Sequence, residues 1–151
     1  MNQSKLKPLQ LIHTAFSIAI LLFALVSFTL AKDQIHFSML VDEKAPFFPL
    51  FPIMGIVLTA LGFFIFNRQV ASVDHTATAD EKIMRYQTAF LIRCALIEAG
   101  ALMNTVAFLL VGNTVFLIIV AFCFLAFIMI RPNKQRMIDA LNLQFPDTEK
   151  L

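Results

Sequence analysis

Charged residues, tyrosine and tryptophan are scarce in this chain of 151 residues. Asp, Glu, Lys and Arg together make up 15% of the sequence, Tyr occurs once, and Trp is absent. A soluble domain carries about 25% charged residues, so this composition argues against a soluble protein. The net charge is +2, and no basic stripe runs along any apolar segment. Nucleic acid is therefore excluded as a partner.

Cysteine is also rare: Cys94 and Cys123 are the two in the chain, and both lie inside apolar runs. They form no CxxC motif, and no His stands near them at metal-ligand spacing. We expect two buried thiols that pack as small apolar side chains, with no disulfide, no metal site and no cofactor. The sequence shows no Ser/His/Asp set and no glycine-rich phosphate loop, so we expect no enzymatic activity.

Apolar residues make up 59% of the chain and are gathered into long runs. A helix needs about 20 such residues to cross a bilayer. The runs predict an all-α protein, an integral membrane four-helix bundle in a single domain covering residues 1–151. The expected spans are about 9–31, 49–66, 86–111 and 114–130, followed by a tail at 131–151. The first run exceeds the 7–15 residues of a signal-peptide core, so it is expected to stay as a span.

The basic residues predict how the spans are oriented. Cytoplasmic loops of membrane proteins are enriched in Lys and Arg. Four spans would put both termini and the 67–85 loop on one side, and the opposite side would hold only Lys32 and Lys44. We therefore expect both termini in the cytoplasm. The basic residues of that side are Lys5, Lys7, Arg68, Lys82, Arg85, Arg131, Lys134, Arg136 and Lys150.

Two short motifs predict where helices begin and end. Thr78 and Glu81 match the S/T-x-x-E capping box, so the third helix is expected to begin near Ala79. Gly112 and Asn113 tolerate the left-handed conformation of a tight turn, and they separate the third span from the fourth.

Two segments are expected to make contacts along their length. Gly55, Thr59 and Gly62 share one face of the second span, and small residues there allow a neighbouring helix to approach closely. Residues 133–143 have the pattern of a short cytoplasmic amphipathic helix on the membrane surface. A frayed, solvated tail is the alternative for that segment.

Two charged residues, Arg93 and Glu98, fall inside the third apolar run. Charges within a membrane helix are expensive, so they are usually paired or functional. With a rise of about 1.5 Å per residue, Arg93 lies about 28 Å inward from the turn at Gly112. Basic residues of the other three spans come at nearly the same height: His13, Arg68 and Arg131. We interpret this level as the cytoplasmic interface, where Arg93 extends along its own helix toward water.

Glu98 is expected to lie about 7 Å deeper than Arg93 and about 140° away around the helix, so the two cannot pair within it. Three alternatives remain for this carboxyl group. It pairs with Arg68, Arg131 or His13 from a neighbouring helix, it is protonated, or it lines a water-filled crevice open to the cytoplasm. The second and third alternatives would make Glu98 a proton or cation site.

Two resemblances bear on these expectations. ALIEAGALMNTVAFLL, residues 95–110, resembles the carboxylate-bearing helix of rotary ATPase proteolipids, which implies that Glu98 can bind a cation. The glycine-rich partner helix of that family is missing here. Over most of its length the chain resembles a family of uncharacterised bacterial four-span membrane proteins that has no assigned activity. That resemblance is carried by Tyr86-Gln87, Glu98, Gly112-Asn113 and the segment Arg131–Lys134, and it implies the bacterial inner membrane.

Two functions follow from these features. The first is a structural or interaction component that packs in the lipid bilayer with itself, as a homo-oligomer, or with another membrane protein. The alternative is a small transporter coupled to protons or cations through Glu98. Its substrate would need an aromatic-lined pocket, for which the sequence offers Phe but only one Tyr.

Overall fold

The computed structural model describes residues 5–40, 47–74, 76–145 and 147–150. Within these residues the chain is all-helical, and its only β contact is an isolated bridge between His36 and Asn113. The all-α prediction is confirmed. The elements are α1 (Leu6–Ala31), η1 (Lys32–Gln34), α2 (Leu50–Ala71), α3 (Ala79–Val111), α4 (Thr114–Met129), α5 (Lys134–Leu141) and η2 (Asp147–Lys150), where η marks a 3₁₀ turn.

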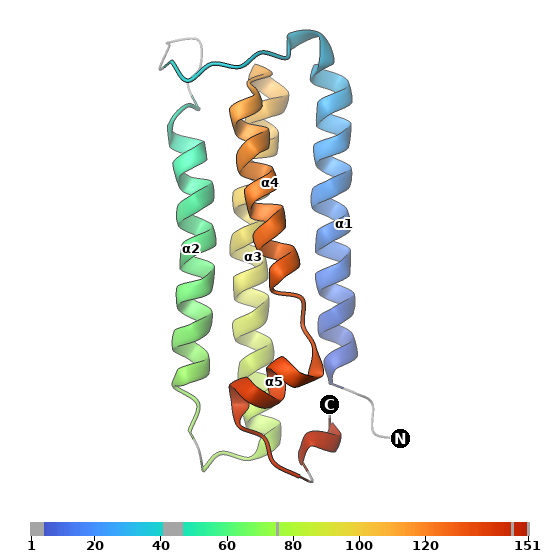
Figure 1. The fold of residues 1–151 in the computed structure, drawn as a ribbon, viewed down its shortest axis with the longest axis vertical. Helices are drawn as coiled ribbons and strands as arrows, with labels where there is room; N and C mark the ends of the chain where they lie inside the picture. The colour runs from blue at the N-terminus through green and yellow to red at the C-terminus, as the bar shows by residue number, and fades with distance from the viewer. Residues whose placement is uncertain (1–4, 41–46, 75, 146, 151) are drawn as a thin grey trace.

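The longest helix, α3, lies at the centre of the arrangement. It contacts α1, α2, α4 and α5, and in Figure 1 it stands behind α4 with α1 and α2 on either side. Successive long helices run in opposite directions. The start of α1, the loop between α2 and α3, and α5 therefore lie at the same end of the molecule (Figure 1), which we call the α5 end.

Three helices are long and apolar enough to cross a membrane, namely α1 with η1, α2 and α3. The fourth, α4, has 16 residues and passes the same test only together with α5, to which it is bent by 77°. At about 1.5 Å per residue, α4 covers about 24 Å, which is most of the roughly 30 Å of a bilayer's hydrocarbon core. By length and composition, the described chain has three to four helices able to span.

The helices extend beyond the apolar runs that predicted them. α1 begins at Leu6, before the run that starts at residue 9, and α2 continues to Ala71, past its expected end at residue 66. Residues 67–71 contain no Pro or Gly to break the helix, so its backbone bonds continue into polar sequence. Hydropathy marks the apolar part of a helix, and the helix itself ends where its backbone bonds end.

The capping box at the start of α3 is confirmed. Thr78 has an extended conformation (ψ 154°), and its hydroxyl accepts a hydrogen bond from the Glu81 N–H. In return the Thr78 N–H donates to the Glu81 carboxylate at 3.0 Å. Both bonds satisfy backbone donors that the first turn of a helix leaves unpaired.

The turn between α3 and α4 is held by the segment that follows α1. Gly112 has a φ of 76°, which confirms the left-handed conformation predicted for this turn. The His36 N–H donates to the Gly112 carbonyl at 3.0 Å, and the Thr114 N–H donates to the His36 carbonyl at 2.9 Å. A Cβ atom at Gly112 would lie 2.3 Å from the Gln34 carbonyl oxygen. Glycine is thus required here both for the positive φ and for the close approach.

The predicted amphipathic helix of the tail exists as α5. Its N-cap is Asn133, whose side-chain oxygen accepts a hydrogen bond from the Arg136 N–H at 2.8 Å. The apolar residues Met137 and Leu141 are buried within the main core cluster. The apolar face of α5 is therefore covered by the bundle and does not face outward, as a helix lying on a membrane surface would require.

Candidate functional site

The side chain of Arg93 lies among three phenyl rings. Its Cζ atom is 3.6 Å from the centroid of the Phe66 ring on α2, and the rings of Phe90 and Phe63 are 5.3 and 5.6 Å away. Only 7% of the residue is exposed, so the expected extension toward water does not occur. A cation above a ring face is attracted by the quadrupole of the ring. That attraction offsets part of the cost of burying the charge.

A glycine on α2 makes room for Arg93. A Cβ atom at Gly62 would lie 3.3 Å from the Arg93 carbonyl oxygen and 3.5 Å from its Cγ. Phe66 follows one turn later on the same face of α2, which puts its ring over the guanidinium group. The guanidinium makes no hydrogen bond or ion pair with any described residue, and its Nε is fully enclosed. Aromatic contact is therefore its main compensation.

His13 satisfies a carbonyl at the end of α4. Its Nε2 lies 2.8 Å from the Phe127 carbonyl oxygen, and because a carbonyl only accepts, the Nε2–H is the donor. The two rings also stack, with centroids 4.7 Å apart. The backbone of α4 leaves this carbonyl partly free because Arg131 donates to Ile128 instead. His13, 6% exposed, thus joins α1 to the end of α4.

Three of the four basic residues expected at one height lie near each other. Arg93 and Arg131 are the charged side chains that act electrostatically on His13, and the His13 ring is 6.3 Å from that of Phe90. Arg68 stands apart: it is exposed on α2, and no hydrogen bond or ion pair within the described residues joins it to the others. Among the described residues, these basic side chains have no acidic partner.

Glu98 has no polar partner among the described residues. It is half-buried on α3, where the exposed residues Ala95 and Ala99 lie on one side of it, and it makes no hydrogen bond or ion pair there. The proposed pairing with Arg68, Arg131 or His13 therefore does not occur. Glu98 instead shares a surface stripe with small and apolar residues.

The face formed by Gly55, Thr59 and Gly62 is buried where α2 meets α3 and α4. A Cβ atom at Gly100 of α3 would lie 3.1 Å from the Gly55 carbonyl oxygen, so the two backbones nearly touch. The Thr59 hydroxyl donates to the Gly55 carbonyl at 2.9 Å and lies 3.5 Å from the thiol of Cys123 on α4. These residues bring helices together and leave no room for a ligand.

Several further residues hold the helices together through side-chain hydrogen bonds. The Asn104 amide donates across to the Phe51 carbonyl at 3.0 Å and along its own helix to the Gly100 carbonyl at 2.9 Å. Asn113 exchanges hydrogen bonds with the backbone of Ser38. An Asn inside an apolar run is a usable signal for an interhelical bond. The contact between Phe66 and Arg93 could not be predicted in this way, because Phe66 is one of 17 Phe residues and nothing in the sequence distinguishes it from the others.

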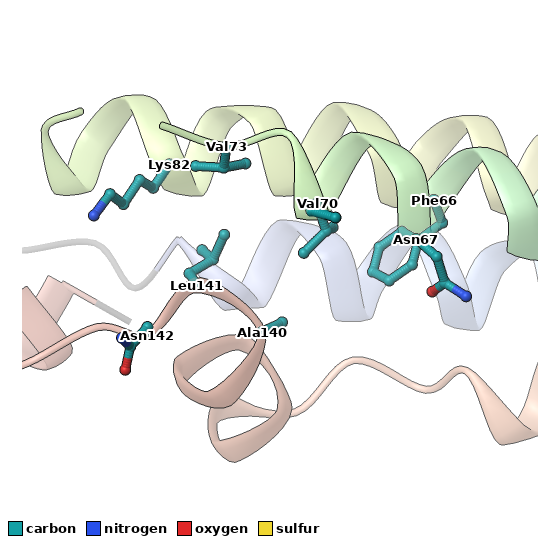
Figure 2. Close-up of a pocket in the computed structure, with 9 residues that line it drawn as sticks. Phe66, Asn67, Val70, Val73, Lys82, Ala140, Leu141 and Asn142 are labelled. Atoms are coloured by element: carbon teal, nitrogen blue, oxygen red, sulfur yellow. The ribbon is translucent and has the colours of Figure 1, made fainter. Parts of the chain in front are cut away.

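Four pockets lie at the α5 end. One of about 380 Å³ lies where α2, α3 and α5 meet (Figure 2), and others there are lined by residues near Lys5, Arg85 and Asp147. Glu98 lines none of these four pockets. Within the described residues no group of three His, Cys, Asp or Glu side chains is placed to hold a metal ion.

Comparison with known proteins adds no assignment. No family model, no curated protein and no solved structure matches the chain. The resemblances to proteolipids and to bacterial four-span proteins therefore stay predictions.

Proposed function

We propose that the chain is a multi-pass protein of the bacterial inner membrane that acts as an interaction component, packing with a second copy of itself or with another membrane protein. In this proposal α1, α2, α3 and α4 each cross the bilayer, and both termini are cytoplasmic. Three observations support it: the exposed apolar surface, the distribution of basic residues, and the position of Glu98.

The exposed apolar surface fits lipid or a partner helix better than water. Only 17% of the apolar window of α1 is buried inside the protein, although its mean hydropathy is 2.3. A soluble protein seldom exposes an apolar patch this long. The large apolar side chains exposed along α1 are Leu11, Ile18, Leu21, Leu22, Leu25, Val26, Phe28 and Leu30.

The basic residues favour a cytoplasmic location for the α5 end. Arg68, Lys82, Arg85 and the residues of the α5 region lie there, while Lys32 lies at the opposite end. Lys44, the other basic residue expected on that opposite side, falls outside the described residues. An excess of Lys and Arg marks the cytoplasmic side of membrane proteins.

The position of Glu98 carries the proposal. If α3 spans the bilayer, this carboxyl group lies on an apolar helix surface away from water, and it has no charged partner among the described residues. Next to it the exposed Ala95 and Ala99 are small enough for another helix to approach closely. A protonated carboxyl would then donate a hydrogen bond to a polar group of that helix. Such a bond is worth about 0.6–2 kcal/mol in a membrane.

The alternative, proton- or cation-coupled transport through Glu98, is favoured by the same lack of a counter-charge. Against transport, none of the four pockets at the α5 end is lined by Glu98. Interaction therefore has more support than transport.

Association in vesicles tests the proposal. Protein labelled with donor or acceptor dyes is reconstituted in phospholipid vesicles, and energy transfer is measured as the protein-to-lipid ratio is varied. We expect Glu98→Leu to weaken association about 3- to 30-fold, matching the loss of one interhelical hydrogen bond. Glu98→Gln retains a hydrogen-bonding group and should associate nearly as well as the original protein.

Asp139→Asn is the matched control, because it removes an exposed carboxylate on α5, outside the apolar helices. It should leave association unchanged. Proton flux is followed in the same vesicles with an enclosed pH-sensitive dye, and Glu98→Gln is expected not to alter it. Association that is insensitive to Glu98→Leu, together with a flux that Glu98→Gln abolishes, would replace the interaction proposal by transport.

A further inference from the structure

A short extended segment, residues 35–40, crosses the end of the molecule opposite α5. In Figure 1 it runs from η1 across the bundle, over the turn between α3 and α4. Ile35 begins it in an extended conformation, with a ψ of 123°. The backbones of His36 and Ser38 are hydrogen-bonded to that turn, where the Asn113 side chain donates to the Ser38 carbonyl at 2.7 Å. The segment is therefore fixed to the bundle by its backbone.

The side chains of this segment form an apolar face and a polar face. Successive residues of an extended chain point to opposite sides, so Ile35, Phe37 and Met39 share one side and His36 and Ser38 share the other. The first three, which we call the apolar row, are 37%, 60% and 66% exposed. The bundle thus leaves much of the row uncovered.

The level of the apolar row matches the edge of the apolar helices. The apolar part of α1 ends at Ala31, and the charged residues Lys32 and Asp33 follow it. The Gln34 carbonyl lies against Gly112, in the turn that follows the apolar part of α3. If α1 and α3 span the bilayer, both helices place the row where the acyl chains of the lipid meet the headgroups.

We propose that the apolar row inserts into the lipid bilayer at this boundary, in the leaflet opposite the α5 end. The inference rests on the proposed membrane location. Two observations favour lipid over a protein partner. The exposed apolar surface of α1 continues toward the same level with Phe28 and Leu30. The segment also has the arrangement of an interfacial element, with apolar side chains on one face and polar ones on the other.

Insertion of the row would fix the position of α4. The Thr114 N–H, at the start of α4, donates to the His36 carbonyl, so a segment anchored in lipid holds this end of the helix at the boundary. α4 covers about 24 Å of a hydrocarbon core of roughly 30 Å, so the remaining gap of about 6 Å lies at its other end, next to Arg131. The leaflet at the α5 end is therefore the one that adapts to the short helix.

Single tryptophans can locate the row, because the chain has none of its own. Phe37→Trp places the reporter in the row, and Ile35→Trp replaces it if Phe37→Trp loses helical circular dichroism. His36→Trp is the matched control, since His36 is exposed on the polar face of the same segment. Leu125→Trp reports the bilayer interior, because Leu125 is exposed on α4 about 16 Å from Thr114.

Each full chain is reconstituted in phosphatidylcholine vesicles whose acyl chains carry bromine either near the headgroup or near the chain end. Bromine quenches Trp on contact, and iodide on both sides of the vesicles quenches Trp that is open to water. We expect Phe37→Trp to be quenched more by bromine near the headgroup than by bromine near the chain end, and Leu125→Trp to show the opposite order. Relative to His36→Trp, the emission of Phe37→Trp should lie at shorter wavelength and be quenched less by iodide.

The results that overturn the insertion differ from those that overturn the membrane location. Iodide quenching of Phe37→Trp without bromine quenching overturns the insertion, while bromine quenching of Leu125→Trp retains the membrane location. Protection of Phe37→Trp from both quenchers would mean that protein covers the row, namely a second copy if the protection decreases as lipid is added, and would also overturn the insertion. If neither brominated lipid quenches Leu125→Trp, the membrane location fails, and the insertion fails with it.

Discussion

At the scale of single residues, Arg93 shows how this chain holds a charge in an apolar setting. Its guanidinium group is covered by the rings of Phe66, Phe90 and Phe63 and has no carboxylate partner among the described residues. A planar guanidinium stacks on a ring face, whereas the ammonium of Lys is a compact, strongly hydrated charge. The rings around residue 93 therefore stabilise a side chain that can stack on them, and a positive charge alone is not sufficient.

This geometry predicts an unusual order of stability for variants of Arg93. Arg93→Met removes the buried charge and keeps an apolar chain of similar length, so the free energy of unfolding should stay the same or rise. Arg93→Lys keeps the charge but loses the stack, and should lower that free energy by about 1–2 kcal/mol. Unfolding of the protein in mild detergent by added dodecyl sulfate, followed by circular dichroism, measures both.

The same two substitutions at the exposed Arg85 provide the control, and neither should change stability by more than about 0.5 kcal/mol. If Arg93→Met proved less stable than Arg93→Lys, the charge itself would be needed, and an anionic partner for it would have to be sought.

At the scale of helices, the crossing of α2 and α3 depends on facing glycines. A Cβ atom at Gly100 would lie 3.1 Å from the Gly55 carbonyl oxygen and 3.2 Å from its Cα. These are backbone atoms, which cannot rotate away. Close backbone approach of this kind is how membrane helices gain van der Waals contact, and Asn104 adds a hydrogen bond to α2 at the same place.

Gly100→Ala should therefore force α2 and α3 apart by a few tenths of an ångström and lower the free energy of unfolding by about 1–3 kcal/mol. The same dodecyl sulfate titration measures it. Gly62→Ala, whose added Cβ would come 3.3 Å from the Arg93 carbonyl oxygen, should cost less. Ala121→Val adds carbon atoms at an exposed position of α4 and should be neutral. A neutral Gly100→Ala would show that the helices are not this close.

At the scale of the whole molecule, the alternation of helix directions gathers the basic residues at the α5 end. The prediction of four spans is supported for three helices and extends to α4 only by its apolar composition, because α4 has 16 residues. A short final helix can still span where the bilayer thins locally or where the residues that flank the helix, here Arg131, reach toward the interface.

Cysteine labelling tests the orientation directly. Cys94 and Cys123 are fully buried, so the protein should react little with a membrane-impermeant maleimide. We expect Met39→Cys, between α1 and α2, to be labelled in intact spheroplasts. Ser72→Cys, in the loop between α2 and α3, should be labelled only after lysis. Labelling of Ser72→Cys in intact spheroplasts would invert the proposed topology.

The sequence by itself determined the helical class and two local boundaries, the start of α3 and the turn between α3 and α4. Apolar run length, the capping box of Thr78 and the turn at Gly112 act on their own neighbours in the chain, so they can be recognised without knowing the partners. Only the tertiary structure decided that Arg93 stacks on Phe66, that Glu98 is half-exposed with no polar partner among the described residues, and that α5 covers the end of the bundle. Those outcomes depend on which residues of neighbouring helices contact each side chain, and the hydropathy of a single segment does not specify these contacts.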